Sequence, residues 1–220
     1  MKKLIWGFIL TVLFTVFMHP VLANSATFTR DAIITGGGII REGQGKDALK
    51  ITFGVNVLVK YLVNEEKQPV DEYGNPTTGG QLVFAQPPIG NFHIVFHNTG
   101  VNDVNKKIFT ATDIKAVAIR PQSHQDSEGE TNYIFARIEA NGKFNGENGW
   151  SILVRFSDFG APGKVKKENP ENRSDAVRIM MFDYPYSAGS EEAVYDTALD
   201  YPREESWRTL LDGGNVTIYY

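Results

Sequence analysis

Alternation of apolar and polar residues with a period of two is the feature that most constrains the fold of this chain. The longest run, at residues 51–61, reads ITFGVNVLVKY, and four of its apolar side chains share one face: Phe53, Val55, Val57 and Val59. Such alternation is typical of half-buried β-strands. Similar runs, separated by glycine-rich or polar turns, lie at residues 81–85, 92–97, 114–120, 132–140, 150–157, 177–183 and 214–220.

The spacing of these runs predicts an all-β fold. About eight or nine short strands with turns between them are typical of a sandwich or a barrel. We predict a single antiparallel β-sandwich, with a closed β-barrel as the alternative. Helical periodicity is almost absent, so at most one short helix is expected, near residues 204–211. The polar stretches 64–80, 122–131 and 164–174 are expected to be surface loops.

The middle of the chain carries the clearest hairpin signal. The strands predicted at residues 132–140 and 150–157 flank the sequence NGKFNGENG. Its Asn-Gly steps supply the positive φ angles that tight turns require. These two strands are therefore expected to pair directly.

The first 23 residues have the three parts of a secretory signal peptide. Lysines follow Met1, residues 4–18 are mostly apolar, and Val21-Leu22-Ala23 offers small residues for cleavage. The apolar run is short for a membrane-spanning helix, which needs about 20 apolar residues. We expect residues 1–23 to be removed, residues 24–220 to form a single all-β domain without an integral membrane span, and the protein to be secreted or periplasmic.

The amino-acid composition excludes several kinds of catalytic and metal-binding chemistry. The chain has no cysteine, which excludes disulfides, thiol catalysis and cysteine metal sites. An exported chain without cysteine and with a Met-Lys-Lys leader favours a bacterial origin. Acidic residues outnumber basic ones by 26 to 22, and a mildly acidic surface disfavours nucleic acid as a partner.

Three consecutive glycines in IITGGGII, residues 33–40, could cradle a phosphate or could shape the backbone. A phosphate-binding loop needs a helix after the glycines, with its N-terminus facing the phosphate. Here Gly38 is followed by Ile39, Ile40 and another predicted strand. Glycines inside a strand more often mark a bulge or the close approach of another backbone, and this structural role is expected here.

The order of several short motifs resembles that of a known family. TGGGII leads to ITFGVNV, GQLVF, ARIEANGKFNGENGWSILVRFSDFGAPG, DAVRIMMFD and a closing LDGGNVTIYY. This succession is similar to exported bacterial post-COAP domains and covers most of residues 33–220. That family has no known biochemical activity, so the resemblance implies a secreted β domain and no catalytic residues.

Three aspartates form the densest polar group in the predicted strands. Asp158 ends one strand, Asp175 begins the next, and Asp183 ends that one. If the two strands pair antiparallel, Asp158 and Asp175 lie at the same edge. Carboxylates on loops are the ligands that calcium prefers, so these three are candidate calcium ligands. The alternative is that they cap turns through nearby backbone amides.

Loop aromatics are the candidates for ligand binding. An exported β domain can bind carbohydrate by stacking sugars on aromatic rings, and a proline between two tyrosines would hold both on a fixed loop. Aromatic side chains on β proteins also serve as core packing. The candidate platform consists of Trp150, Tyr184, Tyr186, Tyr195 and Tyr201.

Three functions fit these observations. The favoured one is a non-catalytic exported module that binds a protein or a glycan at the cell envelope or outside the cell, since no catalytic motif is recognisable. The second is a lipocalin-like barrel that carries a small apolar ligand, with a cavity lined by Phe53, Phe84, Phe135, Phe156 and Phe182. The third is an extracytoplasmic hydrolase or lyase that uses paired carboxylates.

Overall fold

A computed structural model describes residues 27–42, 49–97, 107–126, 129–159, 175–186, 193–197 and 209–220. Nearly all of this part of the chain is β structure. Its elements are β1 (Phe28–Glu42), β2 (Leu49–Val63), the 3-10 turn η2 (Thr78–Gly80), β3 (Ile89–His97), β4 (Lys107–Asp126), β5 (Gly129–Phe144), β6 (Glu147–Asp158), β7 (Ala176–Phe182), β8 (Tyr195–Asp196), β9 (Thr209–Leu210) and β10 (Gly213–Tyr219).

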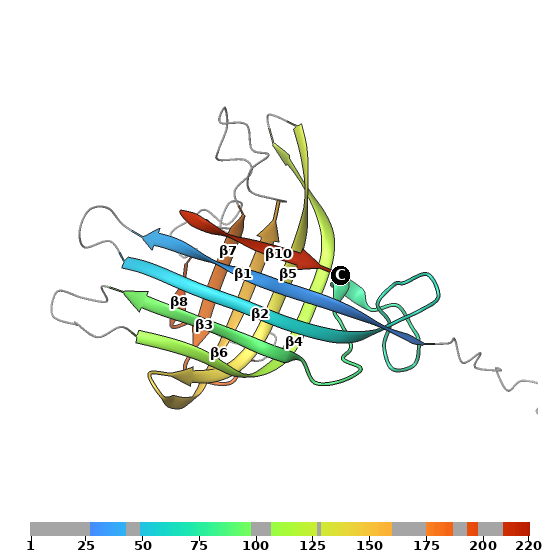
Figure 1. Ribbon diagram of the computed structural model, residues 1–220, viewed down its shortest axis with the longest axis horizontal. Helices are drawn as coiled ribbons and strands as arrows, with labels where there is room; N and C mark the ends of the chain where they lie inside the picture. Colours follow the sequence, from blue (N-terminus) through green and yellow to red (C-terminus); the bar gives the residue numbers. More distant parts are fainter. Residues whose placement is uncertain are drawn as a thin grey trace, which may run out of the picture.

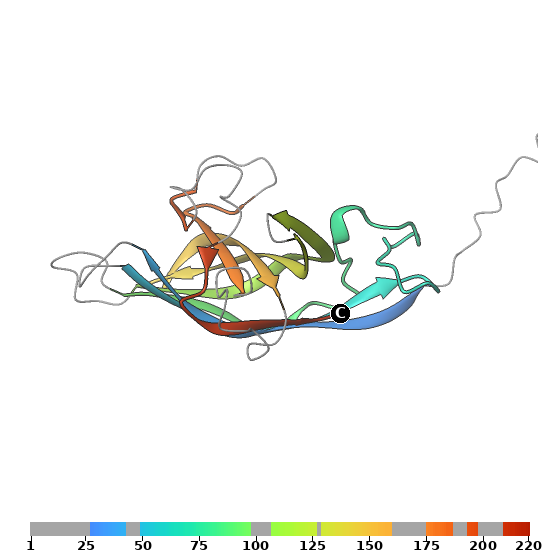
Figure 2. The ribbon, with the colours of Figure 1, turned by 90° about the horizontal axis from the view of Figure 1, so that it is seen from above.

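The strands form one curled antiparallel sheet (Figure 1). Its order is β10-β1-β2-β3-β4-β5-β6-β7-β8, and β9 pairs with β7. Each strand from β1 to β7 pairs with its successor in the chain, whereas the last strand, β10, returns to pair with β1. Figure 2 shows the sheet curling over, so that β6 and β7 lie across from β10 and β1. The result is a half-barrel.

The main core fills the concave side of this sheet. Alternate residues of β2, from Ile51 to Val63, are buried, as the period-two pattern predicted. Aromatic rings meet at the centre: the ring centroids of Phe53 and Phe156 lie 5.8 Å apart, and Phe92 contacts Phe156 edge-on at 6.1 Å. Burial of these apolar side chains is the main force that holds the curl.

The predicted central hairpin is confirmed. β5 and β6 pair from Ile134↔Asp158 to Phe144↔Glu147, and the turn between them uses Asn145 (φ 49°) and Gly146 (φ 87°). The predicted loop at residues 122–131 is wrong in its described part, because β4 and β5 continue their ladder to the pair Asp126↔Gly129. Cross-strand pairing with a neighbour outweighs the polar composition there.

Two other segments differ from their predicted form. The helix expected near residues 204–211 is wrong for Thr209–Leu210, which form strand β9 against β7; residues 204–208 lie outside the described residues. Residues 81–85 contribute only the isolated bridges Gln81↔Ala118 and Tyr61↔Phe84 rather than a full strand.

The triple glycine lies inside β1, where the strand pairs on both edges. Gly36 has φ 135° and lies opposite Val216 of β10 and Val55 of β2. A Cβ atom on Gly36 would lie 2.1 Å from the carbonyl oxygen of Asn215. The expected structural role is confirmed, because only glycine allows the strands to approach this closely.

Candidate functional site

Asp158 and Asp175 lie side by side at one end of β6 and β7, as the antiparallel pairing predicted. The last pair of that ladder is Ser157↔Ala176, which places the two aspartates next in register. Asp175 Oδ2 accepts a hydrogen bond from the Val216 amide at 2.7 Å, and Asp158 Oδ2 accepts one from the Ile218 amide at 2.8 Å. Both carboxylates therefore hold the free edge of β10.

Burial governs the electrostatics of this pair. Asp175 also accepts a hydrogen bond from the Phe159 amide at 3.1 Å through Oδ1. Burial raises the pKa of Asp175, the two amide bonds oppose this, and the charge of Asp158 raises it further. Each oxygen of Asp175 is thus occupied by a backbone amide, which is how a buried carboxylate is normally satisfied.

The third candidate calcium ligand lies elsewhere. Asp183 follows the other end of β7 and is exposed, with the length of that strand between it and Asp175. Within the described part of the chain, no group of three His, Asp or Glu side chains is placed to hold a metal ion. The calcium site stays a prediction, with two of its three ligands adjacent and engaged with amides.

The candidate aromatic platform is divided among separate parts of the sheet. Trp150 packs against Phe144 at 4.7 Å between ring centroids, and Tyr195 contacts Phe96 edge-on at 5.1 Å. Both rings pack against the main core and are half-buried. Tyr201 lies outside the described residues.

Tyr184 and Tyr186 lie on the opposite, outer face. Their rings pack against Phe182 at 5.6 and 4.9 Å, within a second apolar cluster that also contains Leu153 and Met180. The segment is fixed by Ser151, whose hydroxyl donates to the Tyr184 carbonyl and accepts from the Tyr186 amide at 2.8 Å. The proline-held pair predicted from the sequence is therefore anchored to the outer face by Ser151 and by packing against Phe182.

A slot opens in the sheet between β3 and β4. Their ladder covers only four pairs and ends at His93↔Thr110, after which the register of β4 against β5 shifts twice, at Thr112 and at Lys115. Each shift is a β-bulge, which bends a strand and increases its twist. Within the described residues, β4 next pairs with the preceding segment at Leu82, whose amide donates to the Val117 carbonyl at 2.8 Å, and at the bridge Gln81↔Ala118.

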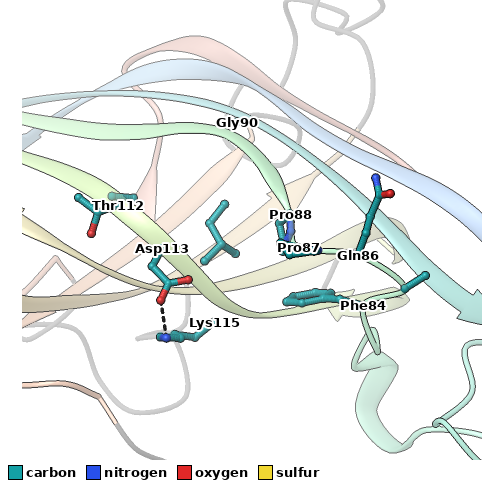
Figure 3. Close-up of a pocket in the computed structure, with 11 residues that line it drawn as sticks. Phe84, Gln86, Pro87, Pro88, Gly90, Thr112, Asp113 and Lys115 are labelled. Atoms are coloured by element: carbon teal, nitrogen blue, oxygen red, sulfur yellow. Dashed lines mark ion pairs between the residues drawn. The ribbon is translucent and has the colours of Figure 1, made fainter.

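The slot is a pocket of about 660 Å³ with mixed chemistry (Figure 3). One wall is the segment from Phe84 to Gly90, in which Pro87 and Pro88 have no amide hydrogen to donate. The other wall is the bulged part of β4, where Asp113 and Lys115 form an exposed ion pair. In the described residues, no backbone pair joins the 111–116 edge of β4 to the opposite wall.

Three arginines lie in a row across the outer face of the sheet. Arg155 on β6 is directly opposite Arg137 on β5 and directly opposite Arg178 on β7. Their side chains lie on the outer face because the neighbouring residues Val154 and Phe156 are buried in the main core. Like charges directly opposite one another on a sheet are destabilising.

The two outer arginines of the row have carboxylate partners. Arg137 Nη2 lies 2.6 Å from Glu139, and Arg178 binds Asp196 through two hydrogen bonds of 3.0 and 2.6 Å. Arg155 has no hydrogen bond or ion pair within the part of the chain that the structure describes. Burial lowers the pKa of Arg155, the charges of Arg178 and Arg137 lower it further, and the charge of Asp196 partly opposes this.

A pocket of about 610 Å³ lies over one end of this row. Its floor includes Arg120, Arg137 and Arg155 from three neighbouring strands, and its rim includes residues of η2. The rings of Tyr133 and Phe135 also line it, and the guanidinium of Arg120 lies 5.3 Å from the centre of the Phe135 ring. We call this the arginine pocket.

Sequence reasoning missed the row of Arg137, Arg155 and Arg178, although a signal was present on strands β5, β6 and β7. Each of the three strands carries one arginine at a polar position between apolar residues, in FARIEA, LVRFS and AVRIM. The alternation shows that these arginines face away from the core. Only the strand register, which the sequence does not state, brings them into one row.

Comparison with known proteins finds no match to a family model, to a curated protein or to a solved structure. The fold and its surface define the class of the protein as an antiparallel β half-barrel with a slotted wall and a row of arginines on its outer face. In the described part of the chain, no helix has the length and the apolar character needed to cross a membrane.

Proposed function

We propose that this protein is an exported, non-catalytic β module that binds a partner at the cell envelope or outside the cell, and that the slot between β3 and β4 receives an extended segment of a protein. The observation that carries the proposal is the open edge of β4 at residues 111–116. An open strand edge offers alternating amide and carbonyl groups that an incoming strand can bind.

The chemistry of the slot favours a peptide with both apolar and polar side chains. Phe84, Pro87 and Pro88 offer apolar surface, whereas Gln86 and Thr112 offer hydrogen-bonding groups. An extended peptide places alternate side chains on opposite sides, so one set would contact the apolar wall and the other would face solvent.

The same features restrict which strands can enter. Proline, lysine and bulges along a strand edge deter pairing between exposed sheet edges. Here two prolines, Lys115 and two bulges surround the slot. Indiscriminate pairing is disfavoured, and a short segment that fits between the walls is favoured.

The test uses a substitution that fills the slot. Thr112 is exposed and lines the pocket, so Thr112→Trp should block it, and Thr110→Trp is the matched control on the same strand outside the pocket. Peptides selected for binding to the wild-type protein should lose binding to Thr112→Trp and keep it with Thr110→Trp. Bound peptide should also protect the amides of residues 111–116 from hydrogen exchange.

Two results would contradict the proposal. One is a set of selected peptides that binds Thr112→Trp as tightly as the wild-type protein. The other is binding without any added protection of residues 111–116, because strand addition must occupy that edge.

The alternative functions have less support. Of the five phenylalanines proposed to line an apolar cavity, Phe135 lines the arginine pocket and Phe182 belongs to the outer cluster. Asp158 and Asp175 give little support to a carboxylate-based hydrolase, because each accepts a hydrogen bond from a backbone amide of β10. The hydrogen bonds from the β10 amides to Asp158 and Asp175, which we call the clasp, favour a barrel-type closure over a two-sheet sandwich. The resemblance to post-COAP domains favours export.

A further inference from the structure

Arg155 forms no ion pair of its own in the described part of the chain, and the more distant Asp196 offsets its charge only in part. Two arginines lie directly opposite it, and their carboxylate partners, Glu139 and Asp196, each form an ion pair with a neighbour rather than with Arg155. A half-buried cation between two like charges lowers the stability of the folded protein. An anion bound beside Arg155 would offset that cost.

The lining of the arginine pocket supplies the remaining parts of an anion site. Arg120, Arg137 and Arg155 all line it, and no Asp or Glu is among its lining residues in the described part of the chain. The side chain of Gln122 is oriented with its amide oxygen toward Arg120. This oxygen accepts a hydrogen bond of 2.9 Å from Arg120 Nη2, and the amide nitrogen donates one of 2.6 Å to the Tyr133 hydroxyl. Arg120 is thereby held at the pocket wall.

We propose that the arginine pocket binds a carboxylate-bearing sugar, with its carboxylate on the guanidinium of Arg155. A guanidinium presents two parallel N–H groups that match the two oxygens of a carboxylate. The volume of the pocket, about 610 Å³, lies within the usual range of small-ligand sites.

The aromatic side chains favour a sugar over an acidic peptide. The rings of Tyr133 and Phe135 line the same pocket as the arginines, so a ligand with a ring body and a charged group can use both surfaces.

Binding is measured by calorimetry with linear trimers of galacturonate and of mannuronate, and with neutral maltotriose as the uncharged probe. The wild-type protein should bind at least one uronate trimer and not maltotriose. Arg155→Gln should raise the dissociation constant of the uronate by about tenfold or more, because the substitution removes a charge-assisted bidentate contact. Arg155→Lys, which keeps the charge without the planar fork, should fall between the two.

The matched control is Arg41→Gln, which removes an exposed arginine on β1, on another part of the sheet. The dissociation constant of the uronate for Arg41→Gln should stay within about twofold of the wild-type value. A nonspecific charge effect would instead weaken binding to Arg41→Gln and to Arg155→Gln alike. Circular dichroism checks that each variant is folded. The proposal is overturned if neither uronate trimer binds, if Arg155→Gln binds as tightly as the wild type, or if hexaglutamate binds equally well with the same dependence on Arg155.

Discussion

Asp175 Oδ2 accepts a hydrogen bond of 2.7 Å from the Val216 amide, across 41 residues of sequence. Two residues further along β10, the Ile218 amide donates in the same way to Asp158. Alternate amides of a strand point to the same side, so the two carboxylates occupy the place that a neighbouring strand would take. The two aspartate side chains thereby join β10, at one end of the strand order, to β6 and β7 near the other end.

Replacement of Asp175 tests this clasp. Asp175→Ala leaves the buried Val216 amide and the Phe159 amide without their acceptor. We expect the free energy of unfolding to fall by about 1–3 kcal/mol for each amide left unsatisfied. Urea denaturation measures the change. Asp183→Ala, at an exposed position, is the control and should stay within about 0.5 kcal/mol of the wild type.

The pH dependence of the same variant has a definite sign. Burial raises the pKa of Asp175 in the folded state above its ordinary value of 3.8, so the folded protein holds this proton more tightly than the unfolded chain. Its contribution to stability is fully present below that ordinary pKa and is lost as the pH rises through the raised one. The stability difference between wild type and Asp175→Ala should therefore be greatest in acid and shrink above pH 3.8. A difference that grows with pH in urea melts would contradict this.

Removal of residues 216–220 should abolish folding. It deletes most of β10, which pairs with β1 from Ile33↔Tyr219 onward, and it deprives Asp158 and Asp175 of the amides that satisfy them. Breaking a buried charged interaction by removing one partner is strongly destabilising. Circular dichroism and thermal melting should show no cooperative transition. A truncated chain that keeps β-type ellipticity and a sharp melt would show that β10 is dispensable.

The sequence predicted the parts of this fold that depend on local pattern. The alternation in residues 51–61 identified the buried face of β2, and Asn145-Gly146 identified the β5–β6 turn. Antiparallel pairing of β6 with β7 is enough to place Asp158 beside Asp175.

The features that escaped prediction depend on register between strands. The bulges at Thr112 and Lys115 open the slot, yet nothing in that stretch of sequence signals an extra residue. The row of Arg137, Arg155 and Arg178 requires three strands in one register. Local alternation specifies which face a residue occupies, whereas register is set by the packing of the whole sheet.

The triple glycine makes a further prediction about packing. Gly36→Ala would place a Cβ 2.1 Å from a backbone oxygen of β10 at a φ of 135°, so the strands must separate. We expect a loss of about 1–3 kcal/mol or more from strain and disrupted pairing. Gly213→Ala is the matched control, because no atom lies within 4 Å of its Cβ position. Equal urea midpoints for the two variants would contradict a steric role for Gly36.

Arg155 should lower stability in the absence of its ligand. Arg155→Gln removes a half-buried charge that lies directly opposite Arg137 and Arg178. Like charges in opposite positions on a sheet cost about 0.2–1 kcal/mol, so the variant should be more stable than the wild type by an amount of that order. Urea denaturation in low salt measures this, and the gain should shrink in high salt as screening weakens the repulsion. A residue that lowers stability in the free protein is typical of a functional position, whereas a destabilised variant would mean that Arg155 supports the fold.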